Sequence, residues 1–97
     1  METKINAIHF DISEKLTSFI NKKIEKLTRR YPNVMSAEVS LRVVKPESAL
    51  NKEATVSLII PQEPDQVVSK TADSFEEAIN VCLEALDKKL EKIKNKK

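Results

Sequence analysis

The last quarter of the chain, residues 73–97, carries an apolar stripe with helical spacing, and this stripe constrains the fold more than any other feature. Successive apolar side chains are three or four residues apart, which at about 100° per residue places them on one narrow face. Ser74 and Glu77 stand in the S-x-x-E relation of a capping box, which marks where a helix begins. We therefore expect one long amphipathic helix that packs its apolar face against the rest of the chain. The stripe comprises Phe75, Ile79, Cys82, Leu83, Leu86, Leu90 and Ile93.

A second amphipathic helix is predicted near the N-terminus, where Asp11 or Ser13 can cap the first turn. Tyr31 closes this helix, because Pro32 disfavours helical backbone in the residue before it. Its apolar stripe consists of Leu16, Phe19, Ile20, Ile24 and Leu27.

Four further segments alternate between apolar and polar side chains and are predicted to be strands. They cover residues 4–10, 35–43, 54–60 and 66–72, with turns at 45–52 and 61–65. The element order is therefore β-α-β-β-β-α. A right-handed crossover makes the first two strands parallel, and the short later connections give an antiparallel meander. We expect an α+β fold, with one four-stranded mixed sheet and two helices packed on one face, as a single domain over residues 1–97.

The charges on both helices are sorted by sign. On the C-terminal helix, the acidic flank beside the apolar stripe comprises Glu76, Glu84, Asp87 and Glu91, and the other flank comprises Lys88, Lys89, Lys92 and Lys96. The net charge is only +2, so affinity for nucleic acid must come from the arrangement of the basic residues. If the two basic flanks join in one positive groove or patch, that surface suits the phosphates of structured RNA. Alternatively, these lysines only solvate the helices and complement their dipoles. The candidate RNA-binding residues are Lys22, Lys23, Lys26, Arg29, Arg30, Lys88, Lys89, Lys92 and Lys96.

Composition argues against an enzyme. The chain has no glycine, which excludes the phosphate-binding loops of nucleotide enzymes. His9 and Cys82 are its single histidine and cysteine, so we predict no catalytic residue, no metal site and no cofactor. Cys82 lies on the apolar stripe and is expected to be a packed core thiol in a reducing compartment. No apolar run has the length of a signal peptide or membrane span, and we expect a cytoplasmic protein without membrane contact.

Two stretches of sequence resemble a known family. Residues 11–27 read D-I-S-E-K-L-T-S-F-I-N-K-K-I-E-K-L, and residues 74–80 read S-F-E-E-A-I-N. They are similar to the short form of the ribosome hibernation promoting factor family, also called ribosome-associated inhibitor or sigma-modulation protein. Lys23, Lys26 and Leu27 match the family's K-x-x-K-L element. Residues 78–80 match its A-I-D element, with Asn80 in place of aspartate.

The resemblance implies a bacterial inhibitor of translation that belongs to the stress response and has the β-α-β-β-β-α fold. Family members bind the small ribosomal subunit in the channel for messenger RNA and transfer-RNA anticodon ends, through the basic faces of both helices. The resemblance also implies a chain that is monomeric off the ribosome and lacks the C-terminal dimerisation domain of the long form. Ser74, Ala85 and residues 88–89 depart from the usual family pattern, so individual contacts can shift.

Two other classes of function remain open on the sequence alone. A double-stranded RNA-binding domain has a similar core, but it begins with a helix and carries lysines at the start of its last helix. Glu76 and Glu77 occupy that position here and would repel phosphate. A small protein-interaction module, whose basic flanks serve only solubility, is the other alternative.

Overall fold

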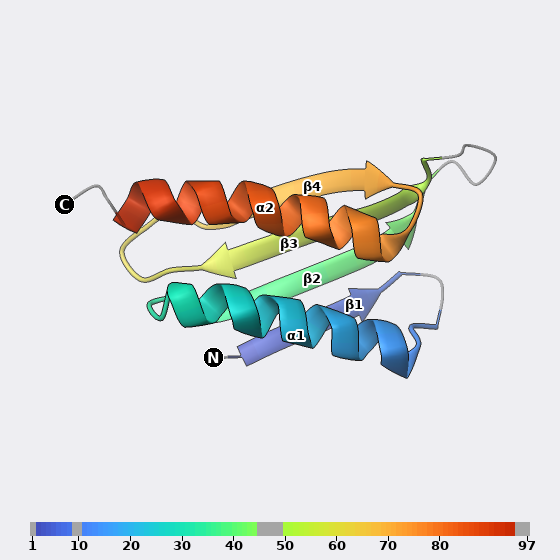
Figure 1. Ribbon diagram of the computed structural model, residues 1–97, viewed down its shortest axis with the longest axis horizontal. Helices are drawn as coiled ribbons and strands as arrows, with labels where there is room; N and C mark the ends of the chain where they lie inside the picture. The colour runs from blue at the N-terminus through green and yellow to red at the C-terminus, as the bar shows by residue number, and fades with distance from the viewer. Residues whose placement is uncertain (1, 9–10, 45–49, 95–97) are drawn as a thin grey trace.

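The elements follow one another in the predicted order β-α-β-β-β-α. In this computed structural model, which describes residues 2–8, 11–44 and 50–94, both helices lie on one face of the sheet (Figure 1). The predicted fold class is thereby confirmed. His9, Phe10, residues 45–49 of the first predicted turn and Lys96 lie outside the described residues. The elements are β1 (Glu2–Ala7), α1 (Glu14–Arg30), β2 (Ser36–Val43), β3 (Lys52–Ile59), β4 (Gln66–Ala72) and α2 (Phe75–Lys94).

The sheet has the strand order β1-β2-β3-β4. β1 pairs with β2 in parallel, with Ile5 opposite Val39, while β2–β3 and β3–β4 are antiparallel. β1 begins two residues earlier than the sequence pattern suggested and ends at Ala7, because Glu2 and Thr3 extend the pairing with β2. The mixed sheet predicted from the connection lengths is therefore confirmed.

Serine hydroxyls start both helices. The Ser13 side chain accepts a hydrogen bond from the Leu16 backbone N–H at 3.1 Å, so Ser13 rather than Asp11 is the N-cap of α1. The Ser74 hydroxyl accepts from the Glu77 N–H at 3.2 Å in the same way. These caps fix the residue at which each helix begins, after the strand that precedes it.

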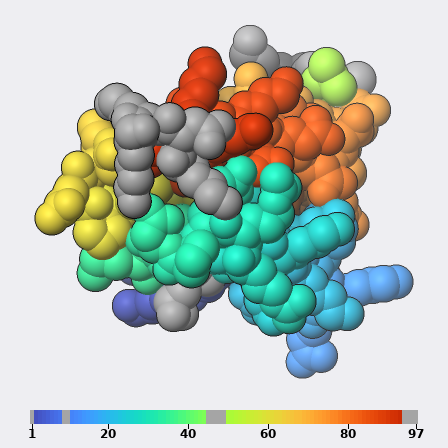
Figure 2. Space-filling view, turned by 60° about the vertical axis from the view of Figure 1, so that its left-hand side comes forward, coloured from blue at the N-terminus to red at the C-terminus, as the bar shows by residue number. Residues whose placement is uncertain are grey.

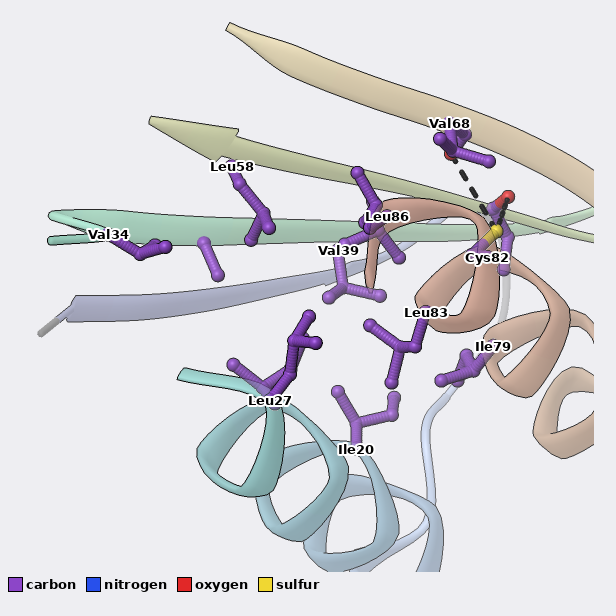
Figure 3. Close-up of a cluster of buried hydrophobic side chains, with 14 of the residues drawn as sticks. Ile20, Leu27, Val34, Val39, Leu58, Val68, Ile79, Cys82, Leu83 and Leu86 are labelled. Carbon is purple, nitrogen blue, oxygen red and sulfur yellow. Dashed lines mark hydrogen bonds between the residues drawn. The ribbon is translucent and has the colours of Figure 1, made fainter. Parts of the chain in front are cut away.

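The core lies between the sheet and the two helices. Ile20, Ile24 and Leu27 of α1 and Ile79, Leu83, Leu86 and Leu90 of α2 are buried there. Leu27 and Leu83 reach into the space between the helices and the sheet (Figure 3). Cys82 is fully buried, and its thiol donates to the Ala54 carbonyl oxygen at 3.3 Å. The prediction that Cys82 is a packed core thiol is confirmed.

The face of the sheet away from the helices is polar. Its side chains alternate with the buried ones, so that Ser40, Thr55 and Ser69 lie in register across three strands. The Thr55 and Ser69 hydroxyls are 2.9 Å apart and hydrogen bonded, and Arg42 donates to Glu53 at 2.6 Å. This face therefore carries mainly polar groups, with Ile59 and Val67 exposed at one end. Lys4 lies on it without an ion pair, but most of the unpaired basic residues that the structure describes are on the helices.

Candidate nucleic-acid interface

The two helices run in the same direction, so their C-terminal halves lie at the same end of the molecule (Figure 1). Between residues 22 and 30, α1 carries five cations and one carboxylate. In α2, residues 75–84 contain no lysine or arginine, and the basic residues begin at Lys88. The basic halves of the two helices consequently share one end. We call this set the basic end; it comprises Lys22, Lys23, Lys26, Arg29, Arg30, Lys88, Lys89 and Lys92.

Most side chains of the basic end are exposed. Lys23 is half-buried, and its ammonium lies 5.5 Å from the centre of the Phe19 ring. Arg29 forms a 2.7 Å ion pair with Glu25, but both side chains are more than half exposed, so the pair is weak and easily exchanged. The end therefore offers several cations that an anionic partner can engage. The exposed members are Lys22, Lys26, Arg29, Arg30, Lys88, Lys89 and Lys92.

Asp87 joins the two helices at this end. One carboxylate oxygen accepts from the Arg30 guanidinium at 2.9 Å, and the other accepts from the Tyr31 hydroxyl at 2.7 Å. Burial, together with this hydrogen bond to the carboxylate, raises the pKa of Tyr31 above its usual value of 10.0. The tyrosine is therefore a neutral donor at physiological pH, and it ties the end of α1 to the last turns of α2.

An open groove of about 210 Å³ runs between the helices. The sequence predicted that the two basic flanks join in one positive groove or patch, and this groove is not that surface, because its lining residues include no lysine from α2. Lys88, Lys89 and Lys92 are not among its lining residues. Lys92 lies five residues, or about 140° of helical rotation, from Asp87, which lines the groove. The wall from α1 is basic, whereas the wall from α2 carries carboxylates and a side-chain amide. The groove is lined by Lys23, Lys26, Leu27 and Arg30 of α1 and by Asn80, Leu83, Glu84 and Asp87 of α2.

A larger cleft of about 790 Å³ opens at the basic end itself. It lies where α1 ends, beside the β3–β4 turn and the last turns of α2. Figure 2 shows these segments from that end, with the turn in yellow, the end of α1 in teal and α2 in red. Apolar side chains such as Ile60 and Leu90 and polar ones such as Asn33 and Gln62 both contribute to its walls.

The described residues offer little for catalysis. They contain no group of three or more His, Cys, Asp or Glu side chains that could hold a metal ion. Burial raises the pKa of the Cys82 thiol from 9.0 to about 11, so it carries no thiolate at neutral pH. No helix within the ranges that the structure describes has the length and apolarity to span a membrane.

Sequence reasoning missed the residues that connect the helices. Arg30 and Asp87 are 57 positions apart, and Asp87 was assigned only to the acidic flank of its helix. Asn80, Glu84 and Asp87 follow one another at steps of four and three, which places them on one side of α2. That spacing shows that the three side chains share one side of α2, but it does not show which element that side faces.

The chain is similar to known proteins both in its sequence and in its fold. The family model described as sigma 54 modulation protein / S30EA ribosomal protein matches residues 3–97. A ribosomal subunit interface protein from Coxiella burnetii aligns with a TM-score of 0.84 at 16% identity, over 97% of this chain and 98% of that one. The N-terminal domain of Thermus thermophilus Protein Y aligns with a TM-score of 0.77 at 17% identity, over 93% and 94%. No curated protein sequence matches the chain. At such identities the structural likeness shows a shared fold.

Proposed function

Because this chain belongs to the sigma 54 modulation protein / S30EA ribosomal protein family, we propose that it is a hibernation factor that binds the small ribosomal subunit and inhibits translation. The family consists of ribosome-associated modulation proteins, which are not enzymes as a class. In our proposal the protein works by occupying ribosomal RNA. It acts in the cytoplasm and is a monomer when it is off the ribosome.

One observation carries this proposal. The parallel course of α1 and α2 gathers eight cations at one end of a chain whose net charge is only +2. Such a concentration of lysine and arginine neutralises phosphates and releases their counterions, so it favours RNA over other partners. The N-terminal half of α2 carries carboxylates instead, including Glu76 and Glu77, and would turn away from the RNA.

The proposed mechanism is steric and electrostatic. The basic end docks against phosphates that line the channel for messenger RNA and anticodon ends, and the bulk of the domain fills the channel. No aromatic platform is needed, since the exposed residues of the basic end are lysines and arginines. In this mechanism shape and phosphate spacing determine binding more than base sequence, as is usual for structured RNA.

Co-sedimentation with purified small subunits tests the proposal. We expect the protein to pellet with vacant subunits, and to be displaced when messenger RNA and transfer RNA occupy the channel. A short RNA duplex at matched phosphate concentration is the control for general affinity. Equal binding to the duplex would favour a double-stranded RNA-binding module, and failure to pellet with vacant subunits would overturn the proposal.

A further inference from the structure

The groove between α1 and α2 has walls of opposite character, which phosphate binding alone does not explain. Carboxylates repel phosphate, so they weaken a surface whose only ligand is phosphate. Glu84 and Asp87 nevertheless form part of the groove wall that α2 contributes. We propose that the groove binds one unpaired nucleobase that carries an amino group, namely adenine, cytosine or guanine. This inference rests on the proposed function, because the base belongs to the RNA that the basic end contacts.

The size and floor of the groove suit a single base. Its volume of about 210 Å³ is several times the roughly 30 Å³ that one water molecule occupies in the liquid. Leu27 from α1 and Leu83 from α2 contribute its apolar lining, and both are almost completely buried. A planar ring placed between the helices would cover this apolar surface and keep its polar edge toward the walls.

The polar groups in the walls are available for such a ligand. Among the described residues, the side chains of Lys26, Asn80 and Glu84 form no hydrogen bond or ion pair. The Arg30–Asp87 pair closes one part of the groove and satisfies its own charges there. Carboxylate and amide oxygens accept from the amino groups of cytosine, adenine and guanine, whereas uracil presents no amino group.

The opposite wall can hold the backbone of the same nucleotide. Lys23 and Lys26 are three residues apart on one side of α1 and both line the groove. A phosphate beside them would sit across the groove from Glu84, and the base would separate the two charges. The arrangement therefore places positive charge where a phosphate is required and an acceptor where an amino group is required.

Titration of the isotope-labelled protein with single nucleotides tests the groove directly. We expect cytidine monophosphate to shift the nuclear magnetic resonances of the Asn80 side-chain amide and of backbone amides near Glu84. The same shifts should require on the order of tenfold more uridine monophosphate, which is the discrimination expected of one good base contact. Equal responses to both nucleotides, or the same response to inorganic phosphate, would overturn the assignment.

A pair of variants tests the role of Glu84 on the ribosome. Glu84 and Glu91 are both exposed and lie seven residues, or about two turns, apart on the same side of α2, but only Glu84 lines the groove. Removing either carboxylate reduces repulsion of phosphate, so Glu91→Met should leave binding to small subunits unchanged or tighter. Glu84→Met should instead weaken binding about tenfold and abolish the preference for cytidine monophosphate. Equal tightening by both variants would sink the proposal.

The experiments distinguish a wrong groove assignment from a wrong proposed function. If the wild-type protein pellets with small subunits but shows no nucleotide preference, the groove assignment falls and the proposed function stands. If it prefers cytidine monophosphate but does not pellet with subunits, the proposed function falls and the groove remains a base-binding site. Melting curves of both glutamate variants confirm that each is folded, since exposed substitutions cost little stability.

Discussion

Single residues hold the basic end in shape, and Asp87 is the one with most partners. It accepts from the exposed guanidinium of Arg30 and from the part-buried hydroxyl of Tyr31. The contact with Tyr31 matters more for stability, because its hydroxyl is part-buried and the 2.7 Å bond to the carboxylate is charge-assisted, whereas the bond to the Asp87 backbone carbonyl is longer, at 3.3 Å. The contact with Arg30 is partly exposed and contributes mainly to the orientation of that side chain.

Asp87→Ala should accordingly lower the free energy of unfolding by about 1–3 kcal/mol. Chemical denaturation at neutral pH measures this change. The matched substitution is Glu91→Ala, one helical turn further along on an exposed position, which should change stability by less than about 0.5 kcal/mol. Similar losses in the two variants would mean that Asp87 contributes no more than an ordinary surface carboxylate.

A second prediction at this scale concerns pH. Folding raises the pKa of Tyr31, and it raises that of Cys82 from 9.0 to about 11, so the folded protein holds these protons more tightly than the unfolded chain. The contribution of Cys82 to stability is complete below about pH 9 and is lost as the pH rises toward 11. The contribution of Tyr31 is complete below its usual pKa of 10.0 and is lost only above it. Cys82→Ala should make the fall in stability between about pH 9 and 11 shallower. An unchanged slope would show that the thiol does not titrate with unfolding.

The helices and strands show how far sequence patterns reach. Period-two alternation and helical stripes were enough to predict the element order, the mixed sheet and the face of each element that is buried. Each of these patterns reports the burial of side chains within its own element. The distribution of charge between the helices was not predictable in this way. Which side of α2 faces α1 depends on the packing of both helices on the sheet, and no residue pattern within α2 alone reports it.

The difference is clearest at Lys92 and Asp87. The two residues lie on opposite flanks of α2, and the lysine flank was expected to join the basic flank of α1 in one groove or patch. The flank that contacts α1 in the groove is the one with Asp87. The basic residues still come together, because the helices are parallel and their C-terminal halves share one end. Lys96 falls outside the described residues, so its role stays a prediction.

At the scale of an element, the apolar stripe of α2 anchors that helix to β3 and β4. Leu86 is fully buried near the middle of the stripe. Leu86→Ala should lower the free energy of unfolding by about 2–5 kcal/mol, through lost transfer energy and the cavity that remains. Val81, on the same helix but partly exposed, is the control, and Val81→Ala should cost far less. A denaturation midpoint that Leu86→Ala leaves unchanged would mean that the stripe does not face the sheet.

At the scale of the whole molecule, the charge is polarised along the helices rather than spread over the surface. The proposed RNA contact therefore depends on many weak ionic contacts at one end. If six to ten phosphates are neutralised, affinity for the small subunit should fall by about 10³–10⁵ between 50 and 200 mM salt. Binding measured across that range at constant magnesium checks this. A nearly constant affinity would point to a protein surface of the ribosome as the partner.

The central claim is that both helices contribute cations to one RNA-binding end, and charge reversal tests it most directly. Three double variants are compared by their dissociation constants for purified small subunits: Lys22→Glu with Lys26→Glu on α1, Lys88→Glu with Lys92→Glu on α2, and Lys4→Glu with Lys15→Glu as the control. Lys15 lies two turns before Lys22 on the same side of α1, and Lys4 lies on the open face of the sheet. Both are exposed and lie outside the basic end.

We predict that each helix variant weakens binding at least about tenfold while the control changes it by less than about threefold, because only the basic end meets phosphates. Circular dichroism should show that all three variants remain folded, since exposed charges contribute little to stability. Loss of binding from one helix alone, or an equal loss in the control, would contradict the account.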